Sequence, residues 1–312
     1  MQLYSKVKTV IKALLDSDFR FCFLAGKGYK GHVSDEVFLK RMYKYKVGKE
    51  LNLEHPTLYT EKLQWLKLYD HRPEYTRMVD KYAVKEYIAE TIGEEYVIPL
   101  LGVWDRVEDI DFDRLPRQFV LKTTHDSGGL VVCKDKDQLD IPAAKRKLRY
   151  FLKRNYYDHN REWPYKNVPH RIIAERFMED SRQGELRDYK FFTFGGVPKV
   201  LYIAQGRGRG GETVADFFDM EFNHLPFTID HDMASVPPEK PANFELMKEL
   251  ATKLSAGIPQ LRVDFYEVDG KVYFGEMTFF HCSGTAPFHP EQWDRTFGEW
   301  VTLPPKSVED IL

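Results

Sequence analysis

The pattern of hydrophobic and polar positions divides the chain into a helical first part and a mixed remainder. Apolar residues recur at helical spacing in residues 35–45, where Ser34 is a suitable N-cap, and again in residues 58–69. Residues 80–93 carry acids and lysines at helical spacing and form a third predicted helix. The first two of these helices lie within residues 1–75, which we therefore expect to be mainly helical.

Strand-like apolar runs dominate from residue 96 onward. Two further helices are predicted among them, at residues 142–157 and 243–255, and proline-rich sequence closes the chain. Gly195-Gly196 is the expected turn of one hairpin. The predicted strands lie within residues 96–104, 118–123, 130–135, 171–178, 188–194, 198–205 and 262–280.

Hairpins mixed with helices predict an α+β fold of at least two lobes. We divide the chain into an N-terminal mainly helical segment, residues 1–75, a small lobe, residues 76–170, and a large lobe, residues 171–312.

Composition supports a large core and argues against several classes of protein. Hydrophobic residues make up 43% of the 312 positions, and the formal net charge is −2. A nearly neutral chain is not built for tight non-specific binding to nucleic acid. The three cysteines are odd in number and widely spaced, which argues against a disulfide framework or a thiolate zinc site and favours a reducing cytoplasm.

The N-terminal residues have the pattern of an amphipathic helix. Lys6, Lys8 and Lys12 lie among apolar positions, so the segment is not a signal peptide, and no apolar run reaches the ~20 residues that a membrane span requires. We expect this helix to pack on the domain, with peripheral contact to an anionic membrane surface as the alternative.

Two acids interrupt the apolar arms of the hairpin at residues 262–280. Asp264 and Glu276 share a face of the sheet if the connecting loop has three residues, with Gly270 in the left-handed conformation. A two-residue Asp269-Gly270 turn would place them on opposite faces.

A shared face would also carry Arg262 and Thr278. Two neighbouring carboxylates repel each other unless a cation lies between them, and oxygen ligands of this kind favour Mg²⁺ completed by water and phosphate. Arg262 could then hold a phosphate or a developing negative charge. The alternative is a solvated strand face with scattered charges.

A lysine followed by a glycine-containing loop forms a second candidate group. Lys122 lies in a strand-like run that leads into THDSGG at residues 124–129. Backbone N–H groups of such a loop can close over phosphates that the lysine holds. The P-loop pattern GxxxxGK[ST] is absent, and a plain hairpin with a lysine reaching solvent is the alternative.

A third candidate group follows in residues 175–190. The backbone of a strand at 175–178 could pair with an adenine edge, Glu185 or Asp188 could reach a ribose or a metal ion, and Lys190 could reach a phosphate. An ordinary strand with outward charges explains the same pattern.

Two glycine-rich motifs are poor matches to known binding patterns. GKGYKG at residues 26–31 matches GxGxxG, but a helix that starts at Ser34 leaves its last glycine outside any helix, so a dinucleotide site is not expected. GRGRGG at residues 206–211 mimics an RNA-binding segment. Because the chain is not basic, we expect a surface loop, either plain or offering Arg207 and Arg209 to an anionic substrate.

Asp111-Phe112-Asp113 mimics the DxD motif of glycosyltransferases. Its neighbours have the composition of a polar connector, so a plain connector is expected here.

The order and spacing of these groups resemble the ATP-grasp superfamily. A closer resemblance is to the TupA-like ATP-grasp proteins of bacterial surface-polysaccharide gene clusters, over about residues 50–300. The stretches that carry it are NLEHPTLYTEKLQWLKLYD, DKYAVKEYI, LPRQFVLKTTHDSGG, DYKFFTFGGVPKV, RVDFY and GEMTFFHCSGTAPFHPEQWD.

The resemblance implies ATP and Mg²⁺ bound between two α+β lobes. The nucleotide-binding candidates are Lys81, Lys122, Ser127, Gly128, Gly129, Glu175, Arg176, Phe177, Met178, Glu185, Asp188 and Lys190. The metal-binding candidates are Asp264, Glu276 and Thr278, and the catalytic candidates are Arg262 and Lys122. The substrate-binding candidates are Arg207, Arg209, His281, Ser283 and Gly284.

Two positions depart from the family pattern. Thr278 stands where many ATP-grasp enzymes have Asn, and GRGRGG stands where the TupA-like proteins usually have an acid–Arg pair.

The resemblance further implies a carboxylate–amine ligase that forms an amide through an acylphosphate. Its partners would be a small-molecule amine and a sugar carboxylate or lipid-linked glycan, at the inner face of the membrane. The alternatives are a sugar kinase or phosphotransferase, a glycosyltransferase of the same pathway, and a non-catalytic nucleotide-binding protein.

Overall fold

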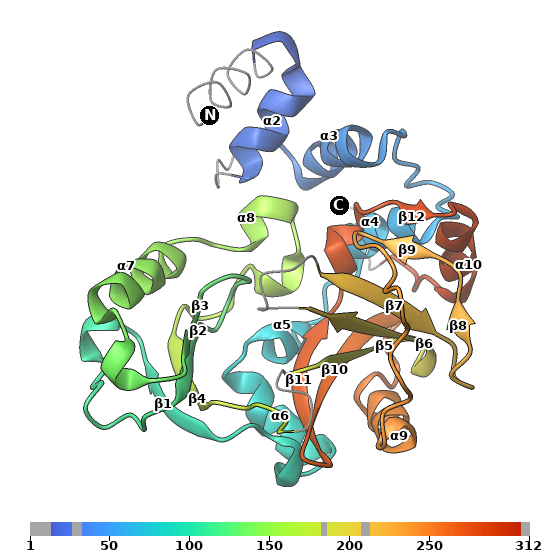
Figure 1. Ribbon diagram of the computed structural model, residues 1–312. Coiled ribbons are helices and arrows are strands. Elements are labelled where there is room, and N and C mark those ends of the chain that lie inside the picture. The colour runs from blue at the N-terminus through green and yellow to red at the C-terminus, as the bar shows by residue number, and fades with distance from the viewer. Residues whose placement is uncertain (1–13, 27–32, 182–185, 207–212, 307–312) are drawn as a thin grey trace.

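The computed structural model describes residues 14–26, 33–181, 186–206 and 213–306. It confirms the expected α+β class, with two main β-sheets in separate lobes and helices over the N-terminal region (Figure 1). In the described part of the chain, no helix combines the length and the apolar character needed to cross a bilayer.

The first sheet has four antiparallel strands in the order β1-β4-β2-β3. Its strands are β1 (Leu100–Trp104), β2 (Phe119–Thr123), β3 (Leu130–Cys133) and β4 (Ile172–Arg176). Helix α7 (Ile141–Leu152) packs on one face, where Leu148 joins Leu121 and Ile172 in a core. The other face of β2 and β4 carries Lys122 and Glu175.

Strand β4 lies beyond the lobe boundary that we placed at residue 171. Its hydrogen bonds to β1 and β2 put it in the sheet of the small lobe. A boundary drawn at a change of sequence pattern misses this, because a strand that follows a long connection can return to an earlier sheet.

The second sheet has six antiparallel strands in the order β11-β10-β5-β6-β7-β8. They are β5 (Asp188–Phe194), β6 (Val197–Gln205), β7 (Val214–Phe218), β8 (His224–Leu225), β10 (Gln260–Val268) and β11 (Lys271–Thr278). A short pair, β9 (Thr228–Ile229) and β12 (Phe288–His289), lies beside it.

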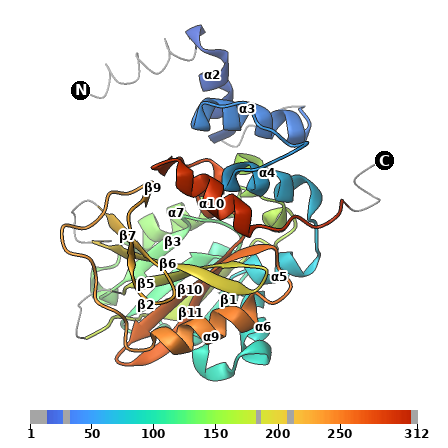
Figure 2. The same cartoon turned by 90° about the vertical axis from the view of Figure 1, so that its right-hand side faces the viewer.

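Strand β5 is buried along its whole length because helices cover both faces of this sheet (Figure 2). Phe191 packs against Phe244 of helix α9 (Phe244–Leu254), with ring centroids 5.8 Å apart. Phe192 points the other way and packs against Phe297, at 5.7 Å. Successive side chains of β5 are therefore packed on opposite faces of the sheet.

The hairpin of β10 and β11 has a shorter loop than we predicted. Val268 pairs with Lys271, so the turn has two residues, and Asp269 and Gly270 both have positive φ (50° and 80°). A β-bulge then inserts Gly275 on β11.

Because of this bulge, Asp264 pairs with Glu276 and Arg262 pairs with Thr278. A Cβ at Gly275 would lie 3.1 Å from the carbonyl oxygen of Asp264, which favours glycine at this place. The predicted shared face therefore exists, although the expected three-residue loop was wrong.

The N-terminal helices follow the sequence pattern closely. Ser34 caps α3 (Asp35–Val47) by accepting from the N–H of Val37, at 3.4 Å. The other helices of this part are α2 (Ser17–Gly26), α4 (Tyr59–Tyr69), α5 (Glu74–Val79) and α6 (Ala83–Thr91), and the short α8 (Tyr157–Asn160) lies farther along the chain. The predicted amphipathic helix falls mostly on residues 1–13, outside the described residues, so its membrane contact stays a prediction.

A helix also lies in the proline-rich closing sequence, for which we predicted no element. Helix α10 (Gln292–Trp300) packs against α4. Trp293, Phe297 and Trp300 have the spacing of one helical face and were a signal that the nearby prolines obscured.

We predict that Gly298→Ala destabilises the protein. In an open helix this change would add about 0.5–1 kcal/mol of stability. Here the new Cβ would lie 2.1 Å from the carbonyl oxygen of Thr57, so we expect the free energy of unfolding to fall by about 2 kcal/mol. Urea denaturation measures this. Glu299→Ala, exposed on the same helix, is the control, and a Gly298 variant at least as stable as wild type would contradict the packing described.

Candidate active site

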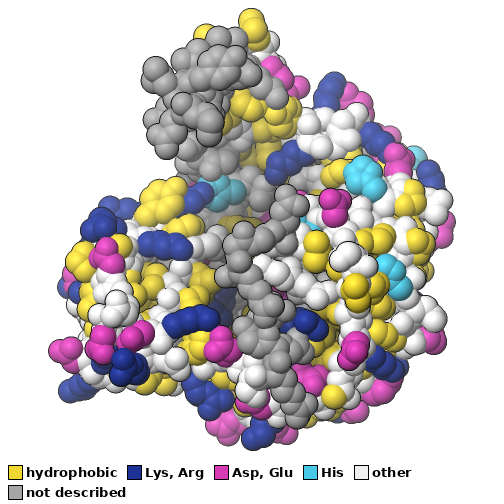
Figure 3. All heavy atoms as spheres, viewed as in Figure 1, with side chains coloured by type: hydrophobic (Ala, Val, Ile, Leu, Met, Phe, Trp, Pro, Cys, Tyr) yellow, Lys and Arg dark blue, Asp and Glu magenta, His cyan; other side chains and the backbone are white. Residues whose placement is uncertain are grey.

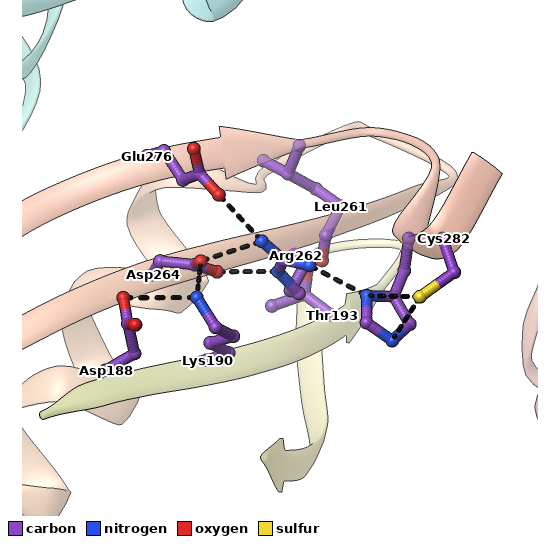
Figure 4. Close-up of polar contacts among 9 residues, drawn as sticks. Asp188, Lys190, Thr193, Leu261, Arg262, Asp264, Glu276 and Cys282 are labelled. Carbon is purple, nitrogen blue, oxygen red and sulfur yellow. Dashed lines mark hydrogen bonds and ion pairs between the residues drawn. The ribbon is translucent and has the colours of Figure 1, made fainter. Parts of the chain in front are cut away.

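Arg262 lies between the two facing acids of the hairpin (Figure 4). Its Nε donates to Asp264 Oδ1 at 2.7 Å, and its Nη2 donates to Asp264 Oδ2 at 2.8 Å and to Glu276 Oε1 at 2.9 Å. Burial disfavours the guanidinium, but the two carboxylates outweigh it and raise the pKa of Arg262. The arginine is therefore a fixed positive charge that holds both acids on one face.

Lys190 on the neighbouring strand β5 contacts one of these acids, Asp264, and also Asp188 (Figure 4). The register of β5 and β10 sets Lys190 directly opposite Asp264, and its Nζ donates to Asp264 Oδ2 and lies 3.1 Å from Asp188 Oδ1. Lys190 and Asp264 are both buried. Three strands thus bring alternating positive and negative side chains together.

The acids fit a magnesium ion shared with phosphate more closely than a protein-only metal centre. Within the described ranges, no group of three or more His, Cys, Asp or Glu side chains has the arrangement of a metal site. Mg²⁺ usually takes one or two carboxylates and completes its shell with water and phosphate oxygens. Glu276 and Thr278 offer oxygen atoms on one face. Both oxygens of Asp264 are already bonded to Arg262 and Lys190, so this acid would take part only after those bonds rearrange.

Glu175 holds two lysines together on the opposite wall. Its Oε1 lies 2.5 Å from Lys85 Nζ, and its Oε2 lies 2.6 Å from Lys122 Nζ. Burial alone would raise the pKa of Glu175, but the charges of Lys122 and Lys85 outweigh it and lower the pKa to about 2. Two ammonium groups are thereby kept side by side, an arrangement that suits a polyanion.

The loop after β2 is tightly folded and lines the same cavity as this lysine pair. Gly128 has a φ of 111°, and a Cβ at Gly129 would lie 1.7 Å from Thr123 Oγ1, so both positions require glycine. Lys81 stabilises the loop, because its Nζ donates to the carbonyl oxygen of Asp126. Burial lowers the pKa of Lys81, against the attraction of Glu276 and Asp126.

These groups line a cavity of about 250 Å³ between the lobes. Figure 3 shows the two lobes from the side of Figure 1, with Lys and Arg side chains on both. The predicted residues in its wall are Lys81, Lys122, Ser127, Gly128, Gly129, Glu175, Asp188, Lys190 and Glu276.

A second cavity of about 670 Å³ adjoins the first. Its wall includes Arg262, Thr278, His281 and Ser283. The two cavities share Lys81, Asp126, Ser127, Lys190 and Glu276.

Other predicted residues lie elsewhere. Arg176, Phe177, Met178, Asp264 and Gly284 are not in the wall of either cavity. Met178 packs with Ile98 and Val268, and Asp264 is buried behind Arg262 and Lys190. The outward Arg176 is near Tyr273 at the surface.

Three predicted residues cannot be placed. Glu185, Arg207 and Arg209 lie outside the described residues, so their assigned contacts stay predictions.

The floor of the larger cavity is a backbone segment in an unusual conformation. Cys282, Ser283 and Gly284 all have positive φ (47°, 55° and 61°), which costs energy for the two residues that have a Cβ. His281, which precedes them, lies with its Nδ1 2.7 Å from Arg262 Nη1. The floor therefore contacts the arginine that holds the acids.

Two buried side chains of α4 hold this segment in place. Lys67 Nζ donates to the carbonyl oxygen and Oγ of Ser283, at 2.9 and 2.8 Å, and Gln64 Nε2 donates to the carbonyl oxygens of Ser283 and Gly284, at 3.0 and 2.8 Å. Burial lowers the pKa of Lys67 to about 7, although the charge of Glu162 acts in the opposite direction.

Sequence reasoning missed Lys85, Lys67 and Glu162. Lys85 follows Lys81 by four residues, a spacing that places two side chains on one side of a helix, and this signal was present. Lys67 and Glu162 have no such signal, because their role depends on contacts between distant parts of the chain.

The aspartates of the DxD-like motif lie away from both cavities. Asp111 accepts from the N–H of Asp113 at 3.1 Å in an exposed turn, and Phe112 is buried in the core of the small lobe. This agrees with the expected connector.

We predict that Glu175→Gln removes stability that depends on pH. At pH 7 the variant should lose about 3 kcal/mol, because two largely buried ammonium groups lose their counter-charge. The folded pKa of about 2 lies below the ordinary 4.5, so the contribution of Glu175 is complete above pH 4.5 and is lost as the pH falls toward 2.

Urea denaturation between pH 7 and pH 2.5 checks this. Glu179→Gln, which alters the exposed pair with Lys134, is the control and should change stability by less than about 0.5 kcal/mol. A difference between wild type and the Glu175 variant that stays constant with pH would contradict the ion-pair description.

No curated protein matches the sequence. Among solved structures, the D-alanine–D-alanine ligase from Bacillus anthracis is 18% identical, with 65% of this chain and 57% of that chain covered and a TM-score of 0.38. This chain thus spans little more than half the length of that ligase.

Two further solved structures are similar at the same level. The RimK domain protein ATP-grasp from Sphaerobacter thermophilus is 12% identical, covering 75% of this chain and 70% of that chain, with a TM-score of 0.41. The N5-carboxyaminoimidazole synthase from Aspergillus clavatus is 14% identical, covering 75% of this chain and 54% of that chain, with a TM-score of 0.39.

The sequence itself matches one family over most of its length. Residues 61–302 fit the family described as TupA-like ATPgrasp, which confirms the resemblance seen in the motifs and the ATP-grasp fold that it implied. The chain belongs to the TupA-like ATP-grasp family.

Proposed function

We propose that the protein is an ATP-dependent carboxylate–amine ligase that forms an amide through an acylphosphate. The observation that carries this proposal is the junction of the two cavities. They meet at Lys81, Ser127, Lys190 and Glu276, so a nucleotide in the smaller cavity would present its terminal phosphate to a molecule in the larger one. A ligase needs this arrangement because its two co-substrates must reach one phosphoryl group.

The first step is phosphoryl transfer to a carboxylate. A carboxylate oxygen of the substrate bonds to the γ-phosphorus of ATP, the bond from that phosphorus to the β–γ bridging oxygen breaks, and ADP leaves. Lys81, Lys122 and the backbone of residues 127–129 would hold the phosphates. Arg262, fixed by its two acids, would face the negative charge that develops.

In the second step the amine attacks the acyl carbon. The C–N bond forms, the bond from carbon to the phosphate oxygen breaks, inorganic phosphate leaves, and the amine loses a proton. The acylphosphate reacts with water, so the loop at residues 124–129 would protect it by covering the phosphate end of the cavity.

Glu276 and Thr278 would hold Mg²⁺ from the cavity wall, and Asp264 would join them once its bonds to Arg262 and Lys190 rearrange. When bound, the ion neutralises phosphate charge and orients the terminal phosphoryl group. Two carboxylates on one face fit this role, and the neutral hydroxyl of Thr278 is a weaker ligand than the amide common in related enzymes.

The family context refines the substrate class. We propose that the carboxylate belongs to a uronic acid of a bacterial surface polysaccharide or its lipid-linked precursor, and that the amine is an amino acid or another small amine. Such glycans are assembled at the inner face of the membrane, which would place the enzyme in the cytoplasm at that surface.

We predict that ADP release requires both co-substrates. Purified protein with ATP and Mg²⁺ is tested with uronic acids alone, amino acids alone and all pairs, with ADP measured by coupled assay and products by mass spectrometry. A ligase gives ADP in quantity, and a product of amide mass, only with a pair. ADP and a phosphorylated sugar from one co-substrate would indicate a sugar kinase instead.

We predict that Glu276→Gln reduces ADP release at least about a hundredfold, because one carboxylate of the pair loses its charge. The fold should persist, since Glu276 is partly exposed, and circular dichroism and thermal unfolding verify this. Asp111→Asn should retain activity near wild type. Loss of activity in the Asp111 variant, with Glu276→Gln still active, would favour a glycosyltransferase.

A further inference from the structure

Lys46 reaches the larger cavity from a part of the chain that the family match does not include. It lies in the last turn of α3, and its side chain is in the cavity wall, whereas the match begins at residue 61. In the described part of the chain, no carboxylate forms an ion pair with it. Lys46 is therefore a cation that this cavity holds available to a ligand.

Helix α3 is fastened at both ends, so the position of Lys46 is well defined. At the start of the helix, Asp35 accepts from Tyr157 Oη and pairs with Arg161 Nε at 3.0 Å, which ties it to α8. Near its end, Tyr43 Oη lies 2.9 Å from Thr60 Oγ1.

Thr60, the partner of Tyr43, is in turn hydrogen-bonded to the large lobe. Thr60 donates through its N–H and its hydroxyl to the carboxylate of Asp294 in α10, at 2.9 and 2.7 Å. The helix is therefore tied to α8 near its start and to α4 near its end (Figure 1), and Lys46 in its last turn lies in the wall of the larger cavity.

The other lysines and arginines of this cavity are committed to the phosphate end. Lys81 and Lys190 also line the smaller cavity, and Arg262 is bonded to Asp264 and Glu276. Among the described Lys and Arg side chains in this wall, Lys46 alone neither lines the smaller cavity nor is bonded to Asp264 and Glu276.

The proposed reaction requires a cation in the part of the larger cavity that is not shared with the smaller one. An amino acid that attacks through its amine brings a carboxylate of its own, which must be kept away from the phosphoryl group or it would compete with the intended acceptor. A positive charge far from the phosphate end binds that carboxylate and orients the amine toward the acyl carbon.

Acids in the same wall complete the match to an amino acid. Glu162 and Asp230 line the cavity together with Lys46. Burial raises the pKa of Glu162, and the charges of Lys67, Arg262 and Lys46 act in the opposite direction and favour its carboxylate form. A cavity with a free ammonium group and nearby carboxylates is complementary to a molecule that carries both charges.

We infer that Lys46 binds the carboxylate of the amine substrate, so that this substrate is an amino acid and not a simple amine. The inference rests on the proposed ligase function, because the smaller cavity must take ATP for the larger one to take the co-substrates. Lys46 is then a specificity-determining residue supplied by the N-terminal helices.

The first test compares amino acids with their amides, for example alanine with alaninamide, as partners of one uronic acid. Lys46→Ala should raise KM for the amino acid about tenfold, leave kcat and the KM for ATP within about twofold, and leave the amide unaffected. Lys44→Ala, which removes an exposed lysine of the same helix that pairs with Glu50, should behave as wild type. Equal behaviour of the two variants would overturn the inference.

The second test does not depend on turnover. Thermal unfolding of the full chain with ADP and Mg²⁺ is followed in the presence of each amino acid and its amide. The inference is supported if an amino acid stabilises wild type, its amide does not, and only Lys46→Ala loses this effect. That result would support the site even if no pair of co-substrates yields ADP. Absence of ADP would contradict the ligase reaction alone. Equal stabilisation by acid and amide, or none by either, would overturn the inference.

Discussion

The fork of hydrogen bonds from Arg262 to Asp264 and Glu276 is the interaction on which the site depends. Two carboxylates on adjacent strands repel each other, and burying Asp264 unpaired would cost several kcal/mol. The guanidinium removes both difficulties, since it bonds each acid and stays charged at any physiological pH. Lys190 adds a second cation on the next strand, so Asp264 is held from two sides.

The hairpin also shows how a small backbone feature decides the chemistry of a site. Side chains alternate along a strand, so a register change of one residue moves an acid to the opposite face. Gly275 supplies that residue within β11, and its lack of a side chain lets the bulge approach the backbone of Asp264. The face that carries Asp264 and Glu276 and the tight two-residue turn can therefore coexist in one hairpin.

Sequence patterns predicted most elements and two of the three groups of candidate residues, because these depend on local spacing. The helix at Ser34, the lysine strand and the acids of the hairpin could all be identified this way. The pairing of Glu175 with Lys85, the support of Ser283 by Lys67 and the helix α10 could not be predicted with the same methods. These depend on which distant segments meet, and in α10 the nearby prolines hid a short apolar pattern.

Helix α3 has a consequence for the shape of the larger cavity. It is tied to α8 through Asp35 and to α4 through Tyr43, and a hydrogen-bonded helix barely stretches. While both ties hold, α8 and the start of α4 therefore keep a nearly fixed separation. Lys46, in the last turn of the same helix, keeps its place in the wall of the cavity under the same condition.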